Sequence, residues 1–309
     1  MFGSFVWGRA FLPALNPQEI RKFNETENVI LAPRCRSRLS PTIDVGELSS
    51  KMTDAAPTRI KLEVTPPVAR ITLSNPPLNV INLPMALELH PALTELEARP
   101  DISTIVFQGD SRAFSAGVDI NAHLPEQIHE MLAAFHAVIR AIVTARTVTI
   151  AAVRGVCLGG GAELAAVCDM VYTARDAVWG FPEIKLASFP PVATVALASI
   201  IGQKRAAELI LTGRHFSGNQ AAALGLANRS VAAAKLDSVV ERTLADLRAL
   251  SPAALLYAKK AIYAWDAIHF DKGLARAEKI YLEELISTAD AREGMIAFLE
   301  KRPPKWIGK

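Results

Sequence analysis

A run of glycines followed by a glutamate, within residues 154–164, is the stretch whose residue types and spacing point most directly to chemistry. The apolar run 147–153 before it predicts a buried strand, and the periodic stretch 162–168 predicts a short helix. Glycines at this junction let the backbone approach a ligand closely, and the free N–H groups of the first helical turn stabilise negative charge. Glu163 lies in that turn, where a carboxylate can move protons. The stretch therefore predicts an oxyanion or anion site, while a tight strand-to-helix connection remains the alternative.

Two other stretches repeat this arrangement of a strand, small residues and an acid. Residues 102–109 read as a strand, and Gly117 and Asp119 follow shortly after it. In the third stretch, 178–184, Glu183 comes directly after a proline. A nucleotide-binding loop is not indicated, because neither the lysine of a P-loop nor a Gly-x-Gly-x-x-Gly pattern is present.

Together the three stretches resemble the enoyl-CoA hydratase/isomerase superfamily, the crotonases. That family has a Phe-x-Ala-Gly-x-Asp-(Ile/Leu) segment, then Gly-x-x-x-Gly-Gly-Gly-x-Glu-Leu, then Phe-x-x-Pro-Glu. These segments correspond here to 114–120, 155–164 and 179–183, in the same order, with Trp179 in place of the usual phenylalanine. The resemblance runs from about Lys61 to the C-terminus and includes the tail 292–302.

The resemblance implies an enzyme that adds water to an α,β-unsaturated acyl-CoA thioester, a hydro-lyase. The backbone N–H groups of Val118 and Gly160 would form an oxyanion hole for the thioester oxygen. Glu163 and Glu183 would be the catalytic acids, one activating a water and the other supplying a proton to carbon. Without the resemblance, Glu163 would be a residue that favours a helix N-terminus, and Glu183 a solvated loop residue.

The resemblance also predicts how the substrate is held. Coenzyme A is expected as part of the substrate, with no separate cofactor and no metal. The family forms trimers, often paired into hexamers, so a homotrimer or homohexamer is expected. In such an assembly a C-terminal helix adds an aromatic residue and a lysine to the site of a neighbouring subunit. The substrate-binding residues predicted in this way are Ala116, Asp119, Ile120, Asn121, Phe298 and Lys301.

One departure bears on the choice of substrate. Typical hydratases follow the second acid with a glycine-rich segment, whereas residues 186–193 carry prolines and larger residues, which stiffen and reshape the pocket wall. This segment and 76–82 resemble the cyclic-dienoyl-CoA hydratases of anaerobic benzoyl-CoA degradation, so cyclohexa-1,5-diene-1-carbonyl-CoA is the predicted substrate. Three alternatives stay open: a straight-chain enoyl-CoA hydratase of β-oxidation, a ring-opening hydrolase acting on a 6-oxocyclohexenyl-CoA, and an RNA-binding homologue.

The resemblance predicts an α/β fold, a superhelix of ββα units with a C-terminal helical trimerisation region. Residues 52–250 are expected to form the core and 251–309 the helical region. Residues 1–51 show no sustained periodicity, unlike the rest of the chain. They are expected to be a poorly ordered extension or the result of an upstream start-codon assignment. Further local patterns predict a β-hairpin over 60–73, a helix over 84–98 with a kink or break at Pro91, an amphipathic helix over 125–145, and a series of helices beyond residue 190.

Composition narrows the function classes. The 309 residues are 50% hydrophobic and carry a formal net charge of +3, which gives no reason to expect nucleic acid or an anionic membrane as a partner. No apolar run is long enough to cross a bilayer, and the three cysteines lack metal or redox spacing, so a cytoplasmic protein with reduced thiols is expected. His129 and His136 are interpreted as ordinary solvated or core residues because their spacing is not that of a metal pair. His123 is the better candidate for a pocket.

Overall fold

The computed structural model describes residues 58–308 apart from 125–126 and 264–266. The predicted extension 1–51 therefore lies outside the described residues. The strands are β1 (Ile60–Thr65), β2 (Val68–Leu73), β3 (Thr104–Gln108), β4 (Ala113–Ser115), β5 (Val148–Val153), β6 (Val156–Leu158), β7 (Met170–Ala174), β8 (Val178–Gly180), β9 (Phe216–Ser217) and β10 (Arg229–Val231). The α-helices are α3 (Leu83–Ala98), α4 (Ile128–Thr144), α5 (Gly160–Ala166), α6 (Pro191–Ile201), α7 (Gln203–Thr212), α8 (Gly218–Leu224), α9 (Leu236–Arg248), α10 (Pro252–Tyr263), α11 (Ala267–Lys279) and α12 (Ala289–Leu299). Short 3₁₀ segments are η1 (Ile120–His123), η2 (Pro182–Leu186) and η3 (Ala233–Lys235), and η4 (Ile280–Leu285) is a π-helical segment.

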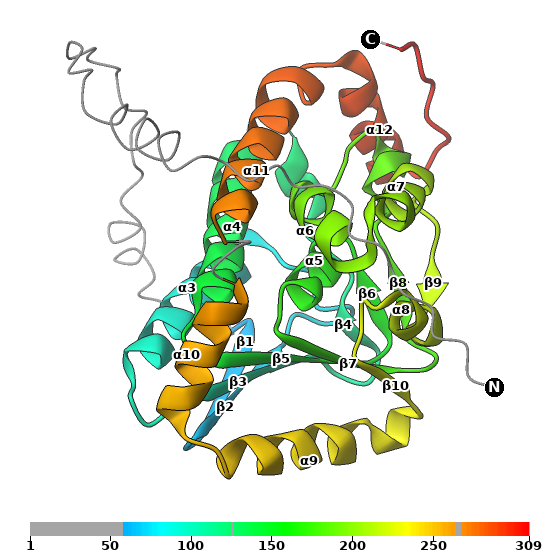
Figure 1. The fold of residues 1–309 in the computed structure, drawn as a ribbon. Coiled ribbons are helices and arrows are strands. Elements are labelled where there is room, and N and C mark those ends of the chain that lie inside the picture. The colour runs from blue at the N-terminus through cyan, green and yellow to red at the C-terminus, as the bar shows by residue number, and fades with distance from the viewer. Residues whose placement is uncertain (1–57, 125–126, 264–266, 309) are drawn as a thin grey trace, which may run out of the picture. The chain divides into compact units, whose positions relative to one another are not determined.

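The strands form two sheets (Figure 1). The larger sheet has the order β1-β2-β3-β5-β7-β10, in which β1 and β2 form the predicted antiparallel hairpin and the remaining neighbours are parallel. The smaller sheet has the order β4-β6-β8-β9, with β4, β6 and β8 parallel. Successive strand pairs β3–β4, β5–β6 and β7–β8 each give one strand to each sheet before the chain enters a helical segment. This repeat is the ββα superhelix predicted for the core.

The central strands β3, β5 and β7 of the larger sheet are buried on both faces, as their near-continuous apolar sequences require, whereas the edge strand β1 is mostly exposed. One face packs against α9, where Val106, Ile150 and Tyr172 meet Val240 and Leu244. The other face joins the main core, which includes residues of α3 and α4. Figure 1 shows α9 below this sheet and α4 above it, and Leu255 of α10 packs against the same cluster as α9.

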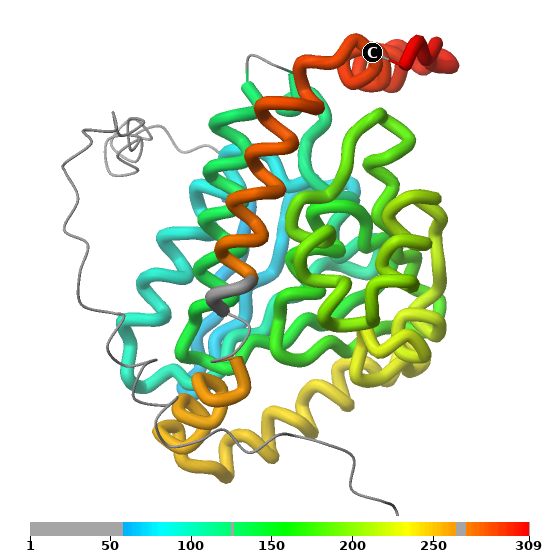
Figure 2. The backbone as a smooth tube through the Cα atoms, turned by 45° about the horizontal axis from the view of Figure 1, so that its top comes forward, coloured from blue at the N-terminus to red at the C-terminus, as the bar shows by residue number. Residues whose placement is uncertain are grey.

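The series of helices predicted beyond residue 190 corresponds to α6 to α12, with one difference in the stretch 272–286. There the chain changes from the α-helix α11 to the π-helical η4. Figure 2 shows α11 running alongside α4, and hydrogen bonds from His136 and Arg140 of α4 to Glu278 of α11 join the two helices. No helix in the described part of the chain is long and apolar enough to cross a membrane.

Of the kink or break predicted at Pro91, the break does not occur, because α3 continues through this residue. Leu89 and Leu93 on either side are buried in the core, and this packing outweighs the hydrogen bond that proline cannot donate. Asn82 begins the helix by accepting a hydrogen bond from the Met85 N–H at 3.1 Å.

Candidate active site

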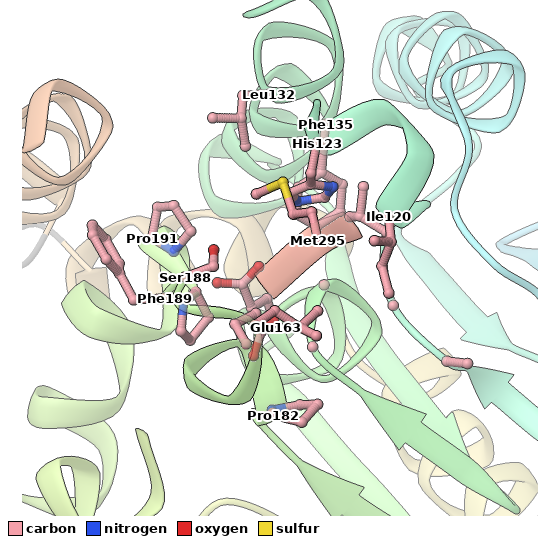
Figure 3. Close-up of a pocket in the computed structure, with 18 of the residues that line it drawn as sticks. Ile120, His123, Leu132, Phe135, Glu163, Pro182, Ser188, Phe189, Pro191 and Met295 are labelled. Carbon is pink, nitrogen blue, oxygen red and sulfur yellow. The ribbon is translucent and has the colours of Figure 1, made fainter. Parts of the chain in front are cut away.

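The three sequence stretches meet because the strands before them are neighbours in the smaller sheet. Strands β4, β6 and β8 are parallel, so their carboxyl ends lie at the same edge. The segments 116–118, 159–160 and 181–183 follow these three strands directly. They line a cavity of about 90 Å³ (Figure 3). Its lining includes Ala116, Gly117, Val118, Ile120, His123, Leu132, Phe135, His136, Gly159, Gly160, Glu163, Pro182, Glu183, Leu186, Ser188, Phe189, Pro190, Pro191 and Met295.

Two backbone N–H groups lie close together in this cavity. A Cβ atom built on Gly117 would lie 3.6 Å from the Gly160 nitrogen, and one built on Gly160 would lie 3.4 Å from the Val118 nitrogen. Among the described residues, neither the Val118 nor the Gly160 N–H donates a hydrogen bond. Gly117 has a φ of 106°, a conformation that glycine adopts without strain and that turns the chain at this point. The pair of free donors can therefore receive one oxygen atom with developing negative charge.

Glu163 lies in the first turn of α5, as the sequence predicts, and only 3% of its surface is exposed. Its Oε1 accepts a hydrogen bond of 2.9 Å from the Ala193 N–H, in the first turn of α6. Burial raises the pKa of Glu163, and hydrogen bonds from the Ala193 and Val192 backbone partly oppose that rise. The proline-containing segment that departs from the family pattern thus holds this carboxylate in place.

Glu183 is placed by the short helix η2, and its carboxyl group lies over Gly159. A Cβ atom at Gly159 would come within 2.6 Å of Glu183 Oε1, so the close approach depends on glycine. Oε2 is buried and has no hydrogen-bond partner within the described residues. Burial raises the pKa of Glu183, and the nearby charge of Glu163 raises it further. The interpretation of Glu183 as a solvated loop residue is therefore wrong.

These raised pKa values predict a change in stability. A carboxyl group whose pKa is higher in the folded than in the unfolded protein stabilises the fold below its unfolded pKa, about 4.3, and loses this contribution as pH rises through the folded pKa. We expect Glu183→Gln to unfold with a free energy about 1–3 kcal/mol higher than the wild type at about pH 9, since it removes a buried charge. At about pH 4 the difference should disappear. Urea unfolding at the two pH values measures it, and a variant less stable than the wild type at the higher pH would contradict the expectation.

The predicted site residues divide into two groups. Glu163, Glu183, Val118, Gly160, Ala116 and Ile120 all line the one cavity. Asp119 and Asn121 do not line it; the Asp119 side chain accepts hydrogen bonds from the Asn121 backbone and side chain at the start of η1. Phe298 and Lys301 are exposed and lie outside the lining of the cavity in their own chain.

The cavity also contains residues that the sequence indicated weakly or not at all. His123 lines the cavity as expected, and its Nδ1 lies 2.8 Å from the Asp119 carbonyl oxygen. Burial lowers its pKa, which favours the uncharged ring. His136 also lines the cavity, so its interpretation as an ordinary core residue is incomplete. Ser188 donates to the Tyr281 hydroxyl at 2.8 Å, and Met295 reaches the cavity from α12.

Comparison with known proteins identifies the family. Residues 63–309 match the family described as enoyl-CoA hydratase/isomerase. The chain belongs to this family. Within it, the chain is 32% identical over 253 residues to a cyclohexa-1,5-dienecarbonyl-CoA hydratase of Thauera aromatica, covering 82% of this chain and 97% of the relative. It is 37% identical over 242 residues to a probable enoyl-CoA hydratase of Mycobacterium bovis, covering 77% and 94%.

Solved structures give the same family. A crystal structure of an enoyl-CoA hydratase from Bacillus anthracis shares 31% identity with a TM-score of 0.66, covering 81% of this chain and all of that one. An enoyl-CoA hydratase from Mycobacterium avium subsp. paratuberculosis has a TM-score of 0.74 at 24% identity, covering 81% and 98%, which supports the fold. The predicted fold class and enzyme class, a hydro-lyase of the enoyl-CoA hydratase/isomerase family, agree with these relatives.

Proposed function

We propose that the protein hydrates an α,β-unsaturated acyl-CoA thioester. The observation that carries the proposal is that two free backbone N–H groups and two buried carboxyl groups line one cavity. The N–H groups of Val118 and Gly160 hold the thioester oxygen, which gains negative charge as water adds to the conjugated system. The oxygen of water forms a bond to the β-carbon, one of its protons passes to a carboxylate, and a proton is delivered to the α-carbon.

The two carboxyl groups suit opposite halves of this reaction. The negative charge of Glu163 raises the pKa of Glu183, so the pair favours a state in which one group is protonated and the other ionised. The ionised group accepts a proton from water, and the protonated group donates one to carbon. Hydration therefore restores the starting protonation of the pair once the two groups exchange a proton.

We further propose that the acyl group is the cyclic diene of cyclohexa-1,5-diene-1-carbonyl-CoA. Three features support a compact ring: the small cavity, the rigid wall of Pro190 and Pro191, and the similarity to a relative that carries this substrate in its name. A straight-chain enoyl-CoA is the second candidate, because the probable enoyl-CoA hydratase of Mycobacterium bovis is 37% identical.

The two candidates are separated by offering crotonyl-CoA and cyclohexa-1,5-diene-1-carbonyl-CoA side by side. Loss of the absorbance of the conjugated thioester reports hydration. We expect both to be hydrated and the cyclic substrate to have the higher kcat/KM. A higher kcat/KM for crotonyl-CoA would favour the straight-chain assignment, and absence of turnover with any unsaturated acyl-CoA would overturn the proposed function.

We also propose that Phe298 and Lys301 act in an assembly, reaching the coenzyme A moiety bound to a neighbouring subunit of a homotrimer or homohexamer. Their exposure in a single chain supports this assignment, because both side chains are free to meet another copy. Light scattering gives the subunit number, and a monomer would contradict the proposal.

A further inference from the structure

Two buried side-chain atoms in the described part of the chain have no hydrogen-bond partner, and both belong to residues that line the same cavity. One is Oε2 of Glu183, which the proposed reaction uses. The other is Nε2 of His136, for which that reaction has no role. Leaving such an atom unpaired in the folded protein costs free energy. A ligand that supplies the missing partner would recover this cost.

The orientation of the His136 ring is fixed from the opposite side of the ring. Its Nδ1 lies 2.7 Å from Oε1 of Glu278, and Arg140 donates to the same oxygen at 2.8 Å. Burial acts to raise the pKa of Glu278, but hydrogen bonds from His136 and Arg140 outweigh it and hold that pKa below its usual range. Glu278 is therefore an ionised acceptor, so Nδ1 carries the hydrogen. The remaining nitrogen, Nε2, is the one left without a partner.

The surroundings of His136 limit which ligand groups can form a hydrogen bond with its Nε2. The His136 side chain is 1% exposed, and Leu132, Phe135 and Met295 add apolar groups to the same cavity. An unpaired polar atom of a residue that lines such a cavity discriminates between ligands, because a ligand without a matching group leaves it unpaired. A hydroxyl group donates to a ring nitrogen that has a lone pair and accepts from one that carries hydrogen. An alcohol oxygen thus pairs with Nε2 in either protonation state.

We propose that His136 Nε2 binds an oxygen on the acyl group, at a position remote from the thioester, and so selects hydroxylated acyl-CoA compounds over purely hydrocarbon ones. The proposal rests on the acyl-CoA hydratase function and refines its substrate class: a ring that carries a hydroxyl then takes the place of the plain cyclic diene as the preferred acyl group. A cyclic acyl group that carries a hydroxyl is a compact example of such a compound. In this role His136 is a specificity-determining residue, and Glu278 is the positioning residue that orients its ring.

A matched set of three unreactive ligands tests the proposal. Cyclohexanecarbonyl-CoA is compared with its 3-hydroxy and 4-hydroxy derivatives, which have no double bond to hydrate and no β-hydroxyl to eliminate. Dissociation constants are measured by calorimetry with the full-length protein. We expect at least one hydroxylated ring to bind the wild type about tenfold more tightly than the plain ring. His136→Leu should bring the ratio to one or below by weakening binding of the hydroxylated ring.

Two control variants separate this role from a structural one. His129→Leu replaces an exposed histidine of the same helix and should keep the tenfold preference. Glu278→Gln keeps an acceptor for the Nδ1 hydrogen and should retain most of the tenfold preference.

If all three rings bind the wild type equally while crotonyl-CoA is hydrated, the inference is overturned and the hydratase function stands. If the preference survives in His136→Leu, the oxygen is bound elsewhere and the inference is again overturned. If no unsaturated acyl-CoA is hydrated, the proposed function itself fails.

Discussion

Replacing Glu163 or Glu183 by glutamine is expected to lower kcat for hydration by about 10²–10⁴-fold, the usual contribution of a positioned acid or base. Glutamine keeps the size of the side chain but neither accepts a proton from water nor delivers one to carbon. In Glu163→Gln the side-chain oxygen can still accept the hydrogen bond from the Ala193 N–H, so the wall formed by α6 should stay in place. Initial rates with saturating substrate give kcat directly.

The matched control is Glu130→Gln, which neutralises an exposed glutamate in the first turn of α4. It should hydrate at the wild-type rate. Binding of an unreactive acyl-CoA should remain within a few-fold in all three variants, because the N–H donors are backbone groups. Wild-type rates in both Glu163→Gln and Glu183→Gln would remove the proposed roles of the two acids.

The second large effect is expected from Gly160→Ala. The added methyl group would lie 2.5 Å from Val118 Cγ2 and 3.2 Å from Phe135 Cζ, so Val118 must move. Displacing one of two oxyanion donors costs about 2.7–4 kcal/mol of transition-state stabilisation, or 10²–10³ in kcat. The loss should appear in kcat more than in binding of an unreactive acyl-CoA, since the oxygen gains its charge in the transition state.

A second substitution tests the cause of that loss. Val118→Ala removes Cγ2, the atom that the new methyl group meets first, and leaves the backbone N–H in place. We expect the double variant Gly160→Ala/Val118→Ala to recover at least tenfold of the lost kcat, and Val118→Ala alone to stay within about tenfold of the wild type. A double variant no faster than Gly160→Ala would show that the loss does not arise from this contact.

The meeting of the three segments at one cavity was predictable because their signals are local. Gly117 and Gly159 adopt positive φ angles of 106° and 50°, which is where the sequence places glycine after a strand. Glu163 follows the glycines within one helical turn, so its position is fixed by its neighbours in the chain. Glu183 needed the family resemblance, because nothing local to η2 shows that its carboxyl group is buried against Gly159.

The features that could not be predicted from the sequence depend on contacts between distant parts of the chain. His136 is paired with Glu278, 142 residues away, and no spacing in the sequence indicates that pair. The continuity of α3 through Pro91 likewise depends on packing around Leu89 and Leu93 rather than on local propensity. The change from α11 to the π-helical η4 also escaped prediction, since a helical pattern over 272–286 does not distinguish the two hydrogen-bond registers.

The central claim is that two main-chain N–H groups hold the thioester oxygen beside a pair of acids. Infrared difference spectroscopy of a ¹³C-labelled thioester carbonyl tests it most directly, using crotonyl-CoA bound to Glu163→Gln/Glu183→Gln, in which hydration is blocked and both N–H groups remain. We predict that the carbonyl stretch moves to lower frequency than in water, and that adding Gly160→Ala reverses most of this shift. A carbonyl stretch at its frequency in water, unchanged by Gly160→Ala, would contradict the account.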